Sequence, residues 1–386
     1  MMAPTSRIRG FSLPELMVAV AIGLVLTLTI STMVVRQEGV RRGVTSGNDL
    51  TSNAAYVSYL LDQELRSAGA GFSQNVRSHY GCNLLVSQNN AQLLPSPAAF
   101  PAPFATVPQA PILTPILVFA GAGANGSDII SVATGNGALG EKAMTISPGS
   151  AAAGQVTMSN TLGVRGGDLM LVSQPAPPVN CMLQQVSPGF AGGAAQVLTF
   201  GGTYAANTIA TVTLSGFATG NPTTVAALGN VTGNQPRLQL LGIGANNVLM
   251  AYDLLQLTAG VQSLAEGVVD LRVRYGVTST PVNPAPNLRT VTGWVAPTAA
   301  GYTAAALSDG SALSQDRLQS IMAVRIGLVL RSDLAEKTDV TPANFTLFGD
   351  LPAALRHTYT VPTGTATQRY RTVEFTVPLR NVRFSR

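Results

Sequence analysis

The strongest constraint on the fold is an uncharged run close to the N-terminus. Residues 16–35 contain no acidic or basic side chain, and they follow a single carboxylate, Glu15. An α-helix rises 1.5 Å per residue, so about 20 residues cross a hydrocarbon layer of roughly 30 Å. The run is therefore long enough to span a membrane. A short basic segment, MMAPTSRIRG, precedes it.

Glu15 decides between the interpretations of this segment. A conventional secretory signal has an apolar region of about 7–15 residues and a small-residue cleavage site after it. This run is longer, and no such site ends it. A plain membrane anchor explains the apolar run but not the acid, because a carboxylate near mid-bilayer costs about 2–3 kcal/mol and less toward the interface. Glu15 is therefore a functional candidate that needs a partner.

The segment RIRGFSLPEL, residues 7–16, resembles the class III signal of type IV pilins and type II secretion pseudopilins. The resemblance implies that a prepilin peptidase cuts between Gly10 and Phe11 and that the new terminal amine is N-methylated. It also implies that Glu15, the fifth residue of the mature chain, pairs with the terminal amine of a neighbouring subunit. Two charges that are costly alone in a bilayer offset one another in such a pair, which favours filament assembly.

The helix is expected to cover residues 11–70, with 11–35 in the membrane and 36–70 amphipathic. Glycines 39, 43 and 47 each cost a helix about 1 kcal/mol relative to Ala, so this part is either a point of bending or a face of small residues. Beyond it, helical spacing returns. Gly69 and Gly71 are expected to end the helix. The predicted apolar stripe consists of Leu50, Ala54, Val57, Leu61 and Leu65.

Composition indicates a loop-rich β head over residues 71–386. Hydrophobic residues make up 46% and charged residues only 11%, and the chain has 39 Gly and 24 Pro. Alternation in IMAVRIGLVLR and YRTVEFTVPL predicts antiparallel strands buried on one face. Seven prolines within residues 95–115 indicate a loop, a linker or an exposed insertion. Further short strands are expected at 116–120, 128–134, 168–173, 197–200, 209–214 and 238–241.

The head segments resemble those of the PilW minor pilins, which are similar to J-type pseudopilins. The segments that carry the resemblance are LDQELRSAGAGF with the later Gly81 and Cys82, NGSDIISV, GGDLMLVS followed by NCMLQQV, LAEGVVDLRVRYGV, MAVRIGLVLRS and RTVEFTVPLRN. The resemblance implies an α+β fold, a long N-terminal transmembrane pilin helix packed on a β-rich antiparallel-sheet head. Residues 135–165 and 190–235 show no match.

Two cysteines, Cys82 and Cys181, can form one bridge in an oxidising compartment, and both fall within the resembling segments. A disulfide is favoured for a periplasm-facing head, and two separate buried thiols are the alternative. A loop of about 100 residues corresponds to a stabilisation of up to about 4–5 kcal/mol.

Enzyme signatures are not found in the sequence. Only two histidines, His79 and His357, are present, so the H-E-x-x-H motif and a three-His metal site are excluded. A G-x-S-x-G elbow and a P-loop are also missing. We therefore expect no enzyme, no cofactor and no metal.

The expected function is that of a minor pilin in type IV pilus assembly, in the initiation or tip complex. Expected partners are other minor pilins, the major pilin, the prepilin peptidase, the inner-membrane assembly platform and a tip adhesin. The subunit would be single-pass in the inner membrane with a periplasmic head, and then part of the pilus used for twitching motility. A type II secretion pseudopilin is the alternative.

A second alternative is a pilin that binds DNA or a surface ligand. The formal charge is +5, which is too mild to indicate nucleic acid by itself. Two sets of basic residues could form a stripe, although a solvated or self-assembly face is favoured for them. The sets are Arg317, Arg325 and Arg331, and Arg369, Arg371 and Arg380.

Overall fold

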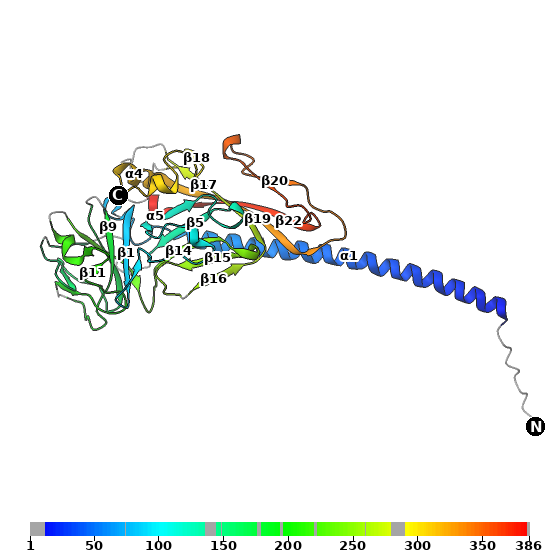
Figure 1. Cartoon of the computed structure of the whole chain (residues 1–386), viewed down its shortest axis with the longest axis horizontal. Coiled ribbons are helices and arrows are strands. Elements are labelled where there is room, and N and C mark those ends of the chain that lie inside the picture. Colours follow the sequence, from blue (N-terminus) through cyan, green and yellow to red (C-terminus); the bar gives the residue numbers. More distant parts are fainter. Residues whose placement is uncertain are drawn as a thin grey trace, which may run out of the picture.

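The computed structural model consists of one long helix that continues into a β-rich head (Figure 1). It describes residues 12–73, 75–135, 144–147, 149–175, 179–193, 196–219, 222–258, 260–278 and 290–383. The helix, α1 (Leu13–Arg66), is a single element of 54 residues, and Pro14 lies in its first turn, where backbone N–H groups need no intrahelical partner. The fold expected from the sequence is therefore confirmed.

The two halves of α1 have different surroundings. The helix has no buried residue before Ser46, and after it the buried side chains follow one stripe. Helical geometry continues through Gly39, Gly43 and Gly47, so the glycines do not interrupt the helix. The stripe is the predicted one, extended by Ser46: Ser46, Leu50, Ala54, Val57, Leu61 and Leu65.

A four-stranded antiparallel sheet lies along the buried stripe of α1 (Figure 1). Its order is β18 (Gly293–Val295), β17 (Val268–Val277), β19 (Ile321–Ala335) and β22 (Gln368–Pro378). The helix contacts β19 and β22 most extensively, the two strands that alternation predicted. The C-terminal half of α1 is thus part of the head's core.

The prediction that β19 is buried on one face only is wrong. Its second face is covered by the hairpin of β20 (Asn344–Leu347) and β21 (His357–Thr360), and Val329 is fully buried there with Phe348. Gly327 permits this close packing, because a Cβ at that position would lie 2.9 Å from the Phe348 ring. Local periodicity does not reveal that a distant hairpin covers the strand.

Two further sheets complete the head. A five-stranded antiparallel sheet has the order β16 (Val261–Ala265), β15 (Leu249–Asp253), β14 (Arg237–Ile243), β5 (Ile129–Thr134) and β4 (Ile116–Phe119). The seven-stranded sheet contains β2 (Ala91–Leu94), β1 (Cys82–Gln88), β3 (Ile112–Leu113), β9 (Asn180–Gln185), β8 (Asp168–Ser173), β13 (Thr224–Asn230) and β6 (Met144–Thr145). The smaller elements are α2 (Val76–His79), α3 (Ala304–Leu307), α4 (Ala312–Ser320), α5 (Arg380–Arg383), and the pairs β7 (Gln155–Thr157) with β10 (Val197–Thr199) and β11 (Thr208–Ile209) with β12 (Val212–Thr213).

Five of the short predicted strands are confirmed as β4, β5, β8, β10 and β14, and the run at 209–214 is not one strand. The chain reverses there between β11 and β12, and Ala210 has a φ of 54°. A single apolar run in the sequence is thus divided by a tight turn.

The proline-rich segment is not an exposed insertion throughout. Phe100, Phe104 and Val107 are buried, and the Phe104 ring lies 6.2 Å from that of Tyr252 on β15, measured between centroids. Aromatic side chains bury large apolar areas, so the residues between the prolines anchor this loop to the core.

The described parts of residues 135–165 and 190–235, which show no resemblance to a known family, contribute to a separate part of the head. Val156, Leu198 and Phe217 are fully or almost fully buried in a second apolar cluster, on the seven-stranded sheet. This distal lobe, which contains β7 and β10–β12, lies at the end of the head away from the N-terminus of α1 (Figure 1).

Candidate assembly interface

The N-terminal half of α1 is an exposed apolar rod (Figure 1). Its large apolar side chains are 55% to 73% exposed from Leu13 to Val35. An 18-residue window has a mean hydropathy of 2.4, and none of it is buried in the chain. Such a surface needs a lipid or protein environment, since leaving it in water forfeits about 25 cal/mol per Å².

Glu15 lies in the first turn of this rod, where the helix dipole favours a negative charge. Its carboxylate accepts a long hydrogen bond of 3.5 Å from the Ser12 hydroxyl. In the described part of the chain, no cation forms an ion pair with it. Gly10 and Phe11 lie outside the described residues, so the cleavage site and the amine partner of Glu15 stay predictions.

Polar contacts fix the head to the middle of α1. Arg371 on β22 donates a hydrogen bond of 2.7 Å to the Thr51 hydroxyl, and Asn53 donates one to the backbone carbonyl of Glu266. Gly43 leaves room for the Arg369 guanidinium, which would lie 3.1 Å from a Cβ at that position. The sequence analysis did not find these anchors, because they join residues more than 200 positions apart.

A second anchor lies nearer the end of α1, where Glu64 pairs with Arg237 on β14. Burial raises the pKa of Glu64, and the guanidinium of Arg237 opposes that rise. The helix is thus held by the four-stranded sheet through Thr51 and by the five-stranded sheet through Glu64.

Members of the two arginine sets from the sequence lie on opposite faces of the four-stranded sheet. Arg325 lies opposite Thr376 in the β19–β22 register, so alternation places Arg369 and Arg371 on the other face of the sheet. Arg325 pairs with both Asp350 and Glu374, each at 2.7 Å. Arg369 pairs with Glu336. Arg325 and Arg369 are therefore paired with acidic side chains of the head itself.

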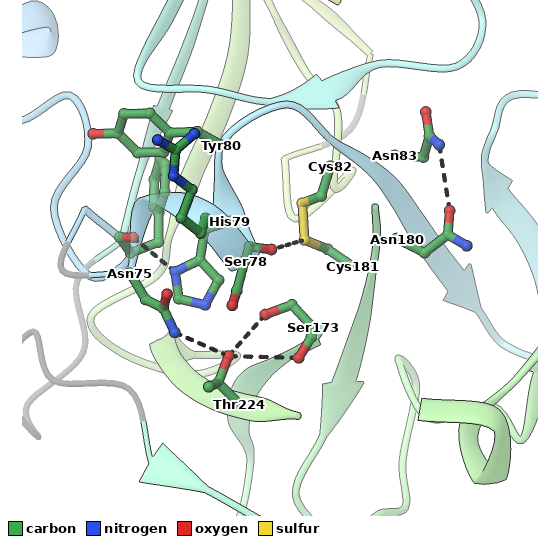
Figure 2. Close-up of a disulfide and its surroundings, with 12 residues drawn as sticks. Asn75, Ser78, His79, Tyr80, Cys82, Asn83, Ser173, Asn180, Cys181 and Thr224 are labelled. Carbon is green, nitrogen blue, oxygen red and sulfur yellow. Dashed lines mark hydrogen bonds between the residues drawn. A yellow bond between two sulfur atoms is a disulfide. The ribbon is translucent and has the colours of Figure 1, made fainter. Parts of the chain in front are cut away.

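The structure contains a disulfide between Cys82 on β1 and Cys181 on β9 (Figure 2). The two strands run parallel, and the Cα atoms of the cysteines are 5.7 Å apart. Both residues are fully buried. The predicted bridge is therefore present in the structure, and the alternative of two separate thiols is not.

His79 lies in the interior close to this bridge (Figure 2). Burial lowers the pKa of His79 to about 4, so the ring is neutral at pH 7. Its Nδ1 has the Phe72 carbonyl as partner, and its Nε2 has no hydrogen-bond partner among the described residues. The other histidine, His357, lies 2.8 Å from Asp270 through Nε2. Neither arrangement brings a nucleophile and a base together.

In the residues that the structure describes, no three His, Cys, Asp or Glu side chains form a group able to hold a metal ion. The geometry of the described residues therefore supports an assembly surface, formed by the exposed half of α1, more strongly than a catalytic site.

Two family models match the chain. Residues 5–31 match the prokaryotic N-terminal methylation motif, and residues 233–381 match the type IV pilus-assembly protein W family. No curated protein matches the chain, and no solved structure does. The first match covers residues 5–12 and the exposed start of α1, and the second covers all four strands of the sheet that holds α1. The chain is therefore similar to the PilW family over residues 233–381 and carries the N-terminal methylation motif, and both matches support a type IV pilus-assembly pilin.

Proposed function

We propose that this chain is a minor pilin that acts in the initiation or tip complex of the type IV pilus. The observation that carries the proposal is the combination of a fully exposed apolar helix bearing Glu15 with a large head fixed to the same helix. Side-by-side packing of such helices buries their apolar surface, and it brings Glu15 close to the N-termini of neighbouring subunits. The large head favours a low-copy position over the repeating shaft.

The proposal includes the order of segments. Residues 1–10 are the leader, 11–35 cross the inner membrane, 36–70 form the amphipathic part, and 71–386 form the head in the periplasm. Cleavage after Gly10 and methylation of Phe11 precede assembly, after which the head is exposed on the pilus. The partners are the prepilin peptidase, the inner-membrane platform, the major pilin and other minor pilins, with a tip adhesin as a further candidate.

Gene deletion with complementation tests this function. We expect surface pili and twitching motility to be lost on deletion and restored by the intact gene. Normal piliation in the deletion strain would overturn the proposal. Intact pili together with lost secretion of exported enzymes would instead identify a secretion pseudopilin.

A further inference from the structure

A polar pocket lies between the last turns of α1 and one face of the five-stranded sheet. Its volume is about 560 Å³, within the range of about 300–1,000 Å³ that is usual for small-ligand sites. Strands β14, β15 and β16 form the floor, and Leu60 and Glu64 of α1 form one wall. The loops at residues 232–236 and 257–258 form the other walls. We call it the amide pocket.

The floor of the amide pocket presents two side-chain amides on one face of the sheet. Gln239 on β14 lies opposite Asp253 on β15, and Gln262 on β16 lies opposite Ala251, so these side chains point to the same side. Neither Gln239 nor Gln262 forms a side-chain hydrogen bond with another residue that the structure describes. Both amides are therefore available to a ligand.

The two loop walls are held by hydrogen bonds within the chain. The side-chain oxygen of Asn230 accepts hydrogen bonds from the backbone N–H and from the hydroxyl of Thr232, at 3.0 and 2.8 Å. The carboxylate of Asp253 accepts two backbone hydrogen bonds, each of 3.0 Å, from the turn that follows β15. A pocket whose walls are already ordered loses little conformational entropy when a ligand binds.

The charges of the amide pocket favour an uncharged ligand. Glu64 pairs with Arg237, so their charges largely cancel. An anionic ligand would meet the carboxylates of Glu64 and Asp253, and a cationic ligand would meet Arg237. Residues 169–236, which include one wall, contain no acidic or basic side chain. A neutral molecule therefore fits the pocket best.

Hydroxyl groups match the amide pocket better than other uncharged groups do. A hydroxyl both donates and accepts hydrogen bonds, and so does a side-chain amide, whereas a carboxylate only accepts and a guanidinium only donates. Leu60, Leu257 and Leu264 add apolar surface beside the amides, which suits the C–H faces of a sugar ring. A peptide would pair its backbone with a free strand edge, but the floor of this pocket is the face of a sheet.

We propose that the amide pocket binds an uncharged carbohydrate. Gln239 and Gln262 form hydrogen bonds with its hydroxyl groups, and the three leucines contact the faces of its rings. The N–H groups of Arg237 that do not bond to Glu64 donate to a further hydroxyl. The inference goes beyond the proposed function, because pilus initiation requires no sugar site. Sugar binding and piliation can therefore be measured separately.

Binding of the full chain to a printed array of oligosaccharides tests this assignment. The chain is purified in lauryldimethylamine oxide, a detergent without a sugar headgroup. The array holds uncharged gluco-, galacto- and manno-oligosaccharides beside sialylated and sulfated ones. We expect binding to one or more of the uncharged oligosaccharides. No binding to any of them, or binding confined to the charged ones, would overturn the inference.

Two variants and a control assign the binding to the pocket. Gln239→Ala and Gln262→Ala should each lower the affinity for the bound oligosaccharide by about three- to tenfold, because each removes one hydrogen-bonding amide. Gln109→Ala, at an exposed position of the proline-rich segment outside the pocket, is the control and should leave the affinity unchanged. Thermal unfolding checks that the variants are folded, and Gln262 is exposed, so its replacement leaves the core intact. Equal affinity of the intact chain and both pocket variants would contradict the proposal.

Discussion

The Nδ1 atom of His79 lies 2.7 Å from the carbonyl oxygen of Phe72, in the interior next to the Cys82–Cys181 bridge. Burial lowers the pKa of His79 from 6.5 to about 4. Between these two values the unfolded chain binds a proton that the folded chain does not, so the free energy of unfolding falls as pH decreases. We expect His79 to account for a loss of about 3 kcal/mol between pH 7 and pH 4.

Urea denaturation of the chain and of His79→Gln at pH 7 and pH 4.5 measures this contribution. The variant should lose less stability on acidification, because a neutral amide cannot take up the proton. Burial raises the pKa values of Asp128 and Asp253, which act in the opposite direction and are present in both proteins. Equal pH dependence in the two proteins would exclude His79 as the source.

The disulfide predicts a large effect of removing both cysteines. Its residues are separated by 99 positions, and closing a loop of this length lowers the entropy of the unfolded chain by an amount worth about 4–5 kcal/mol. Cys82→Ala combined with Cys181→Ala should reduce the free energy of unfolding by an amount of that order, measured without reductant. Labelling of the denatured chain should find no free thiol, and two reactive thiols would contradict the bridge.

The proposed role of Glu15 predicts that Glu15→Leu reduces pilus incorporation at least tenfold. The substitution removes the charge that we propose pairs with a neighbouring amine, but it leaves the proposed cleavage site at Gly10–Phe11, so processing should be unaffected. Asp62→Asn is the control, since Asp62 lies on the head part of α1 and already pairs with Arg66. Immunoblots of sheared pili and of membranes measure incorporation and processing. Equal incorporation of both variants would show that Glu15 has no role in stacking.

Arg325 is predicted to stabilise the second face of β19. Its guanidinium bonds to Asp350 and Glu374 and lies 5.6 Å from the centre of the Phe348 ring. Arg325→Met should lower the free energy of unfolding by about 1–3 kcal/mol, because it leaves Glu374 without its cation.

Arg66→Met provides the comparison for this change. Arg66 forms an exposed pair with Asp62 one turn earlier on α1, and such pairs contribute about 0.5 kcal/mol or less. Thermal unfolding of the two variants separates the effects. A fall in Tm for Arg66→Met as large as that for Arg325→Met would contradict the role assigned to Arg325.

Elements with a clear local period were predicted well. The stripe from Leu50 to Leu65 and the alternation in β19 and β22 identify both partners of the central helix–sheet contact, because the face that packs on the other element carries apolar residues at a regular spacing. The resemblance of residues 7–16 to the class III signal concerns the cleavage site and the first turn of α1. It does not depend on the head.

Features produced by distant parts of the chain were not predictable in this way. The hairpin over Val329, the burial of Phe104 between prolines and the turn at Ala210 each depend on contacts or backbone conformations that leave no period in the sequence. The groove between Val35 and residues 335–338 belongs to the same group, since it lies between parts of the chain about 300 residues apart. Local patterns therefore predict α1 and the strands that pack on it, but they do not predict the loops and hairpins that distant parts of the chain place beside them.

The continuity of α1 has a mechanical consequence. The helix runs without interruption from Leu13 to Arg66, and its last third lies along β19 and β22. A force applied at the N-terminal end, along the helix axis, therefore reaches the sheet through one uninterrupted helix. The contacts at Thr51, Asn53 and Glu64 share this load in shear, so the head is pulled as one body with the helix.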